Sequence, residues 1–223
     1  MHQQDRSVLF LGKKDDRHVE KALEFVRLNF ADVAVHLCGW GDPFPRNARL
    51  WKGDYIISYL SRWIVPGDLL KRARVAAINF HPASPEYAGI GCNNFALYEE
   101  ASEFGVTCHH MAPKVDTGNI IEVVRFPVFS TDTVASLLAR TYDQQLLLFY
   151  KIMCMCRTRR ELPTSSEQWT RNPFTRRQLN DLARITPNMS REEIARRSRA
   201  VSFGPWQPTV ELHGFSFQLK APA

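Results

Sequence analysis

The stretch Ser7–Cys38, SVLFLGKKDDRHVEKALEFVRLNFADVAVHLC, decides the expected fold. It opens with a short apolar run over residues 7–11, which is typical of a buried parallel strand. The acidic pair that follows is placed to cap a helix over Arg17–Asn29, which has apolar residues at helical spacing. A second apolar run covers residues 33–38. Strand, helix and strand in this order predict a parallel α/β sheet.

The pattern continues beyond Cys38. Four further strands are predicted over residues 54–60, 75–79, 106–111 and 120–128. A short helix is expected over 67–72, another over 93–103, and a long apolar helix from Asp132 or Thr133 to about Cys156. We therefore expect an α/β fold with a Rossmann-like, mostly parallel sheet and flanking helices.

A Pro/Ser/Thr cluster at residues 163–166 indicates a boundary. We expect a catalytic domain over residues 1–162 and a C-terminal extension over residues 163–223. Thr175 with Gln178, and Ser190 with Glu193, match the capping-box pattern and predict two short helices. Residues 209–212 and 215–219 alternate between apolar and polar around His213-Gly214, which predicts a β-hairpin.

Composition narrows the class of protein. The chain has 223 residues, 44% of them hydrophobic, which is normal for a globular protein. No apolar run is long enough to span a membrane, and no apolar signal-peptide core precedes the first strand, so we expect a cytoplasmic protein. The net charge of +6 favours anionic partners. Nothing beyond this charge indicates a nucleic-acid partner, because no recognition motif is present.

The cysteine pattern does not favour a metal site. Cys154 and Cys156 lie inside a predicted helix, and no second Cys/His pair follows at the spacing of a zinc finger. The number of cysteines is odd, at five, and in a cytosolic chain such thiols are usually reduced. We predict no metal.

Three polar residues are expected at one edge of the sheet. Asn79 and His81 come at the end of a predicted strand, and Asp116 lies in the loop after another. Ligands of open parallel sheets bind at the carboxyl ends of the strands. These residue types suit acyl transfer to an amine. The amide can stabilise an oxyanion, the imidazole can accept or donate a proton, and the carboxylate can orient the imidazole. Alone, a histidine after a strand is more often a structural group than a catalyst, and the Asn-x-His-Pro and Asp-Thr-Gly patterns are each compatible with a turn.

Taken together, these residues carry a family resemblance. The ordered set is Ile78-Asn79-Phe80-His81-Pro82, then Tyr87-x-Gly89, Gly105-Val106-Thr107 and Val115-Asp116-Thr117-Gly118-Asn119-Ile120-Ile121. This set resembles the folate-dependent formyltransferase superfamily and covers about residues 54–128 well. The resemblance implies Asn79, His81 and Asp116 as the catalytic residues and 10-formyltetrahydrofolate as the formyl donor.

The resemblance also implies where the ligands bind. The folate is expected against the segment that includes Leu60, Arg62, Trp63 and Ile64, and against the loop Pro113, Lys114, Val115 and Asp116, mostly through backbone groups. Tyr87 and Asn94 follow His81 and are expected to border the acceptor. Packing for Tyr87 and helix capping for Asn94 are equally good interpretations.

The acceptor is inferred from the rest of the chain. About sixty residues follow the core, and they indicate helices and a hairpin, not the β-barrel of a methionyl-tRNA formyltransferase. The chain looks most like the small sugar N-formyltransferases, which formylate a nucleotide-linked amino sugar for polysaccharide biosynthesis. Transfer to glycinamide ribonucleotide or another amine is the alternative, and a non-catalytic folate-binding protein is a further one. The hairpin would be marginal alone, so we expect a homodimer.

Overall fold

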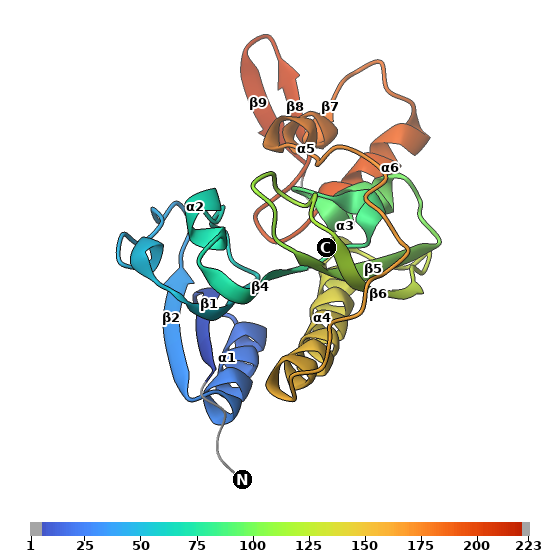
Figure 1. The fold of residues 1–223 in the computed structure, drawn as a ribbon. Helices are drawn as coiled ribbons and strands as arrows, with labels where there is room; N and C mark the ends of the chain where they lie inside the picture. Colours follow the sequence, from blue (N-terminus) through green and yellow to red (C-terminus); the bar gives the residue numbers. More distant parts are fainter. Residues whose placement is uncertain (1–5, 220–223) are drawn as a thin grey trace.

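The structure is a computed structural model that describes residues 6–219, so most of the polar segment before the first strand lies outside the described residues. A six-stranded sheet forms its centre, with strand order β2-β1-β3-β4-β5-β6 (Figure 1). The strands are β1 (Ser7–Lys13), β2 (Asp32–Cys38), β3 (Gly53–Tyr59), β4 (Ala73–His81), β5 (Glu103–His110) and β6 (Ile120–Pro127). The first four are parallel to one another, β5 pairs antiparallel with β4, and β6 pairs antiparallel with β5. The expected mostly parallel α/β sheet is confirmed.

Successive side chains along each strand point to opposite faces of the sheet, so the core has one part on each face. Val8 and Phe10 of β1 pack with α1 (Arg17–Asn29) and α4 (Val134–Arg157). Leu9 and Leu11 point to the other face, toward α2 (Gly67–Leu70). Strands β1 and β3 are buried along nearly their whole length, whereas β2 and β4 are partly exposed. Burial on both faces explains the near-continuous apolar sequence of β1.

Several predicted boundaries differ from the observed ones. The helix expected over 93–103 is α3 (Cys92–Tyr98), because Glu100 has a positive φ of 53° and β5 begins at Glu103. Strand β4 continues two residues beyond its expected end, because Phe80 and His81 pair with the antiparallel strand β5. Two 3₁₀ turns also form, η1 (Ala48–Leu50) and η2 (Pro85–Tyr87).

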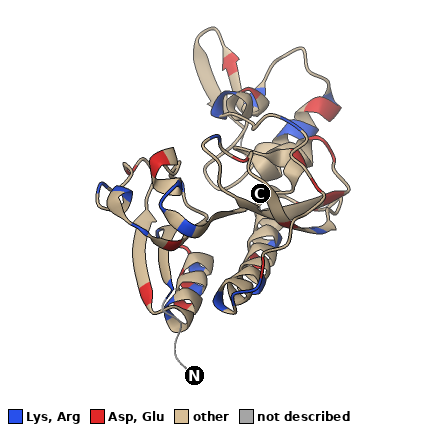
Figure 2. Cartoon of the chain, in the orientation of Figure 1, with Lys and Arg blue, Asp and Glu red and all other residues tan. Residues whose placement is uncertain are grey.

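The C-terminal extension has the two predicted helices and the predicted hairpin. These are α5 (Arg176–Ala183), α6 (Arg191–Val201), β8 (Thr209–Leu212) and β9 (Phe215–Gln218), with a short strand β7 (Arg184–Ile185) that was not expected. Figure 1 shows the hairpin at the end of the molecule opposite the N-terminus. Basic and acidic residues both lie on these helices and on α1 (Figure 2). No helix among residues 6–219 is long and apolar enough to cross a membrane.

Two glycines allow close backbone approaches near the end of β4, one to the extension and one within the core. Gly89 has a φ of 92° and forms a bridge with Phe174, and a Cβ at Gly89 would collide with the Phe174 carbonyl oxygen. Gly118 passes so close to His110 that a side chain there would collide with the His110 carbonyl oxygen. Both close approaches hold loops at the carboxyl end of β4.

Candidate active site

Asn79 and His81 are brought together by strand β4. They are two residues apart and so point to the same side of the sheet. Asn79 is paired with Ser58 of β3 on one side and with His109 of β5 on the other. The His81 ring is buried, and its Nε2 lies 3.1 Å from the Tyr87 carbonyl oxygen, to which it can donate.

Asp116 reaches the same place from the loop between β5 and β6. It is 6% exposed and has a positive φ of 47°. One carboxylate oxygen, Oδ2, accepts from the Gly89 N–H at 2.9 Å and lies 3.4 Å from His81 Nδ1. An imidazolium at His81 would therefore donate to both Tyr87 and Asp116. The three residues predicted from the sequence lie side by side.

The charge on Asp116 is stabilised by its neighbours. Burial raises the pKa of this carboxyl, but the charge of His81, the hydrogen bond and charge of His109 and the Gly89 N–H outweigh burial. The net result lowers the pKa of Asp116 to about 2. Asp116 is therefore a carboxylate at neutral pH, despite its burial.

His109 is a fourth polar residue of the site and was not predicted. Its Nδ1 lies 2.8 Å from the His110 carbonyl oxygen, which fixes the proton on Nδ1 in the neutral ring. In that neutral form Nε2 accepts from Asn79 Nδ2 at 3.0 Å. Nε2 also lies 3.4 Å from Asp116 Oδ1, to which it donates when the ring is protonated. His109 joins the amide to the carboxylate. The alternation of side-chain direction along β5 tells which face of the sheet His109 is on. It does not tell that β5 pairs with β4, and this pairing is what places His109 beside Asn79.

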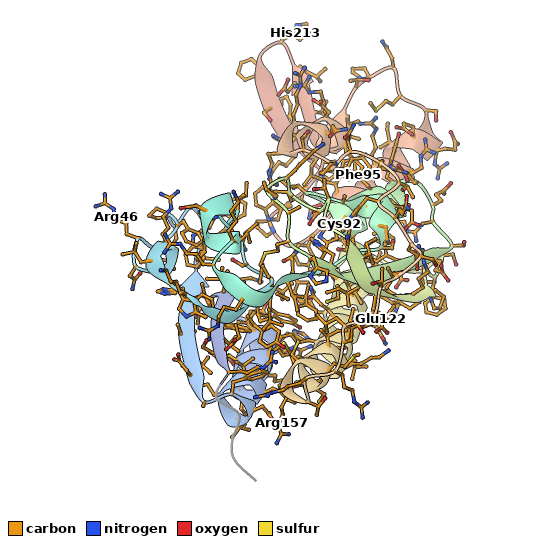
Figure 3. All side chains as sticks on the ribbon, viewed as in Figure 1. Arg46, Cys92, Phe95, Glu122, Arg157 and His213 are labelled. Carbon is orange, nitrogen blue, oxygen red and sulfur yellow. The ribbon has the colours of Figure 1, made fainter. Side chains whose placement is uncertain are left out.

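Two further side chains enclose the reacting centre. Trp169, from the extension, packs edge-on against the rings of His81 and His109, and its indole N–H donates to the Gly118 carbonyl at 2.8 Å. The Cys92 thiol lies 3.8 Å from His81 Nε2 and donates to the Gly89 carbonyl. Burial raises the pKa of this thiol to about 12, so Cys92 is not a nucleophile at neutral pH. Cys92 is the buried first residue of α3 and is labelled in Figure 3.

A cavity of about 1100 Å³ is lined by Asn79, His81, Cys92, His109 and Asp116. The segment after β3 forms one wall, with Leu60, Arg62, Trp63 and Ile64, and Val115 and Asp116 contribute from the loop. Leu60 has a positive φ of 52°, a rare conformation outside glycine that is typical of functional sites. Apolar side chains with nearby turn backbone fit an aromatic ring system that needs hydrogen bonds at its edge.

The remaining predicted residues lie less directly at the cavity. Pro113 and Lys114 are exposed and do not line it; the Lys114 carbonyl accepts from the Thr117 hydroxyl at 2.8 Å. The Tyr87 ring is buried against Phe104, so the backbone of Tyr87 and not its ring meets His81. Asn94 lines the cavity, but its amide also donates to the Ala200 carbonyl at 2.6 Å.

The extension supplies the opposite wall of the cavity. Its lining residues are Pro173, Phe174, Thr175, Arg176, Leu179, Asn180, Ala183, Val201, Phe203, Trp206 and Gln207. Sequence patterns did not predict this role, because it depends on how α5 and α6 pack. Among residues 6–219 no group of histidine, cysteine or acidic residues could hold a metal ion, and the five cysteines are free thiols.

Comparisons with known proteins show which proteins this chain is similar to. Residues 45–152 match a family model described as formyl transferase. GDP-perosamine N-formyltransferase from Brucella melitensis is 30% identical over 209 residues, which are 92% of this chain and 78% of that protein. A 4-N formyltransferase from Francisella tularensis has the same fold, with a TM-score of 0.78, 19% identity and coverage of 96% of this chain and 97% of that one.

A third protein of similar fold was solved with ligands. It is an N-formyltransferase from Helicobacter canadensis in complex with folinic acid and dTDP-3-aminofucose. Its TM-score is 0.71 at 19% identity, and the match covers 94% of this chain and 85% of that one.

Proposed function

The chain belongs to the formyl transferase family, among the sugar N-formyltransferases, and we propose that it transfers a formyl group from 10-formyltetrahydrofolate to the amine of a nucleotide-linked amino sugar. The observation that carries this proposal is the meeting of Asn79, His81 and Asp116 at one cavity. The folinic acid and amino sugar nucleotide held by the Helicobacter canadensis protein support the choice of donor and acceptor.

The proposed binding regions follow the two walls of the cavity. The folate lies against Leu60, Arg62, Trp63, Ile64, Val115 and Asp116. Pro113 and Lys114 contribute to the folate site by shaping the loop that carries Asp116. The acceptor enters along the extension, with Asn94 at its border and Tyr87 acting through its backbone.

The proposed roles at the reacting centre follow from the hydrogen bonds. Asn79 uses one N–H to reach His109, which leaves the second N–H to donate to the oxyanion that forms when the amine attacks. A comparable oxyanion donor contributes about 3–4 kcal/mol elsewhere. His81 stabilises the same charge or handles the proton of the amine, and Asp116 holds the imidazolium. Because its pKa is low, Asp116 acts mainly through its charge.

The test is a transfer assay with direct detection of the product. Purified protein and 10-formyltetrahydrofolate are offered nucleotide-linked amino sugars and glycinamide ribonucleotide, and mass spectrometry detects the formyl adduct. We expect an adduct on an amino sugar nucleotide. An adduct on glycinamide ribonucleotide alone would favour the alternative acceptor, and release of formate without any acceptor would indicate hydrolysis.

Two variants connect the activity to the site. His81→Ala and Asp116→Ala should lower kcat by at least about 100-fold while the circular dichroism spectrum stays that of the wild type. Near-wild-type turnover in either variant would contradict the proposed roles. Folate binding without turnover on any amine would point to a binding protein.

The proposed assembly is a cytoplasmic homodimer that binds no nucleic acid. Its interface is the apolar face of the C-terminal hairpin, where Val210 pairs with Phe217 and Leu212 with Phe215. Phe215 is 69% exposed and Phe217 is 54% exposed, although aromatic side chains of this size are usually buried. A second copy of the hairpin would cover this face.

A further inference from the structure

Trp40 stands between two arginines at the cavity. The Arg62 guanidinium carbon lies 4.6 Å from the centre of the indole ring, and that of Arg176 lies 5.5 Å from it. All three side chains line the cavity. Trp40 follows β2, Arg62 follows β3 and Arg176 begins α5, so the three residues join the sheet domain to the extension.

The loop that carries Trp40 is well anchored although the indole itself is exposed. Asp42 accepts from the Gly39 N–H at 2.8 Å and from Lys14 Nζ at 3.1 Å. The Trp63 indole donates to the Asp42 carbonyl at 2.8 Å. Trp40 nevertheless keeps 69% of its surface exposed. The loop therefore holds a large aromatic side chain at the cavity, with its surface free for a ligand.

The two guanidinium groups lack a negative partner in the described part of the chain. Neither Arg62 nor Arg176 forms an ion pair or a hydrogen bond through its side chain among residues 6–219. Arg171 differs, because it is paired with Glu99 at 2.7 Å. Two unpaired cations on one aromatic ring repel each other, so an anion that binds both is favoured.

The rest of the cavity lining does not offset this charge. Lys13 also lines the cavity, and it is paired with Asp16 at 2.8 Å. Among the described residues, Asp116 is the one acidic residue in the lining, and both of its oxygens face histidines. The unbalanced positive charge is therefore at Trp40, Arg62 and Arg176, which we call the tryptophan–arginine clamp.

We propose that the tryptophan–arginine clamp binds the anionic end of a ligand whose reactive end lies at Asn79 and His81. This proposal rests on the proposed function, which supplies two sources of such an anion. One is the diphosphate of the nucleotide-linked sugar, and the other is the glutamate of the folate. Either anion accepts paired N–H donors from planar guanidinium groups. The Trp40 indole holds the guanidinium groups of Arg62 and Arg176 in place.

Binding measurements distinguish the two sources without any turnover. Calorimetry would measure the dissociation constants of GDP, dTDP, GMP and folinic acid for the wild type and for Arg176→Ala, Arg62→Ala and Trp40→Ala. Loss of one charge-assisted contact should raise the dissociation constant of the ligand that the clamp binds by about tenfold or more. A weaker affinity for the nucleoside diphosphates assigns the clamp to the acceptor, whereas a weaker affinity for folinic acid assigns it to the donor.

The chain offers a matched control on the same helix turn. Arg177 neighbours Arg176 in α5, does not line the cavity and is 91% exposed. Arg177→Ala should leave every dissociation constant within about twofold of the wild type. Arg176→Lys, which keeps the charge and loses the planar group, should recover only part of the affinity.

The clamp proposal fails if the three alanine variants bind every probe like the wild type. A lower melting temperature with unchanged dissociation constants would show that the stacking only holds the extension in place. Because these readouts need no amine, they stay informative if the transfer assay yields no product. In that case diphosphate or folate binding by the clamp would stand while the proposed reaction would not.

Discussion

At the scale of single residues, Asp116 is the one carboxylate among the described residues that line the cavity, and several partners hold it. It meets His81, His109 and the Gly89 N–H, and its backbone adopts a left-handed conformation. These contacts favour the charged form and lower the pKa of Asp116 to about 2, against a usual value of 3.8. A lowered pKa in the folded state contributes stability above the unfolded pKa, and the contribution disappears as the pH falls through the folded value.

Asp116→Asn should therefore change how the free energy of unfolding depends on pH. Between pH 4 and pH 2 the wild type should lose roughly 2 kcal/mol more free energy of unfolding than the variant. Other carboxylates with a lowered pKa, such as Asp132 and Glu193, are present in both proteins and cancel in the difference. Urea unfolding at a series of pH values measures this. Parallel curves for the two proteins would contradict the described environment of Asp116.

His109 is expected to act through Asn79, because its Nε2 accepts from the amide. Asn79→Ala should lower kcat by about 10²- to 10³-fold, as loss of an oxyanion donor does. His109→Gln should lower kcat less, and the double variant should be no worse than Asn79→Ala alone, since residues in one network are not additive. His110→Gln is the control, because that side chain does not line the cavity. Multiplying effects in the double variant would show that His109 acts independently.

The sequence predicted the residues of the reacting centre that belong to recognisable local motifs, and it missed those that only long-range packing brings there. Asn79 and His81 share one strand, so their spacing indicated that they point the same way. Asp116 lies in a loop after another strand, and the family resemblance of the ordered motifs joined it to the other two. His109 and Trp169 come from an antiparallel pairing and from the extension. Long-range packing of this kind leaves no local pattern, and these two residues were missed.

At the scale of elements, two helices share the same cap but differ in their surroundings. Thr133 caps α4 and Thr175 caps α5, each with a complete capping box. Helix α4 has 24 residues and packs into the main core, whereas α5 has eight residues and buries only Leu182. A helix of eight residues is marginal without its tertiary contacts.

Removing the two caps one at a time should affect different properties, global stability for α4 and ligand binding for α5. Thr133→Ala should cost about 1 kcal/mol of global stability and leave ligand binding unchanged. Thr175→Ala should fray the turn that begins with Arg176, so the ligand of the tryptophan–arginine clamp should bind several-fold more weakly with little change in melting temperature. Calorimetry and thermal unfolding measure both. Equal effects of the two variants on binding would contradict a separate role for α5.

Element positions followed from the sequence wherever caps and periodicity agreed. Helix α1 was predicted with its observed bounds, because Asp16 caps it and its apolar stripe is regular. The end of α3 was misplaced, because the chain reverses at Glu100 without a glycine to indicate the turn. Strand β7 has two residues and forms only through pairing with β8, so no local pattern could indicate it.

At the scale of the whole molecule, the extension is part of the candidate site and also carries the exposed hairpin. Phe174 and Arg176 line the cavity and Trp169 packs against the rings of His81 and His109, whereas Figure 3 places His213 at the hairpin tip, far from Cys92. The sequence indicated a boundary at residue 163 and a hairpin beyond it. It did not indicate that the segment between them closes the cavity, because that depends on contacts such as the Gly89–Phe174 bridge.

The proposed dimer can be broken without touching the cavity. Phe215 and Phe217 lie on one face of β9, and β9 is the edge strand of its sheet. Phe215→Glu with Phe217→Glu places charges on the apolar face and should convert a dimer to a monomer in sedimentation velocity, because two copies could no longer bury that face. Ser216→Lys is the matched control, since Ser216 lies on the opposite face beside Glu211 and should leave the dimer intact. The double variant should keep the wild-type affinity for the ligand of the clamp, because neither phenylalanine lines the cavity. A double variant that stays dimeric would assign the interface to another surface, and one that also loses ligand binding would show that the dimer supports the cavity.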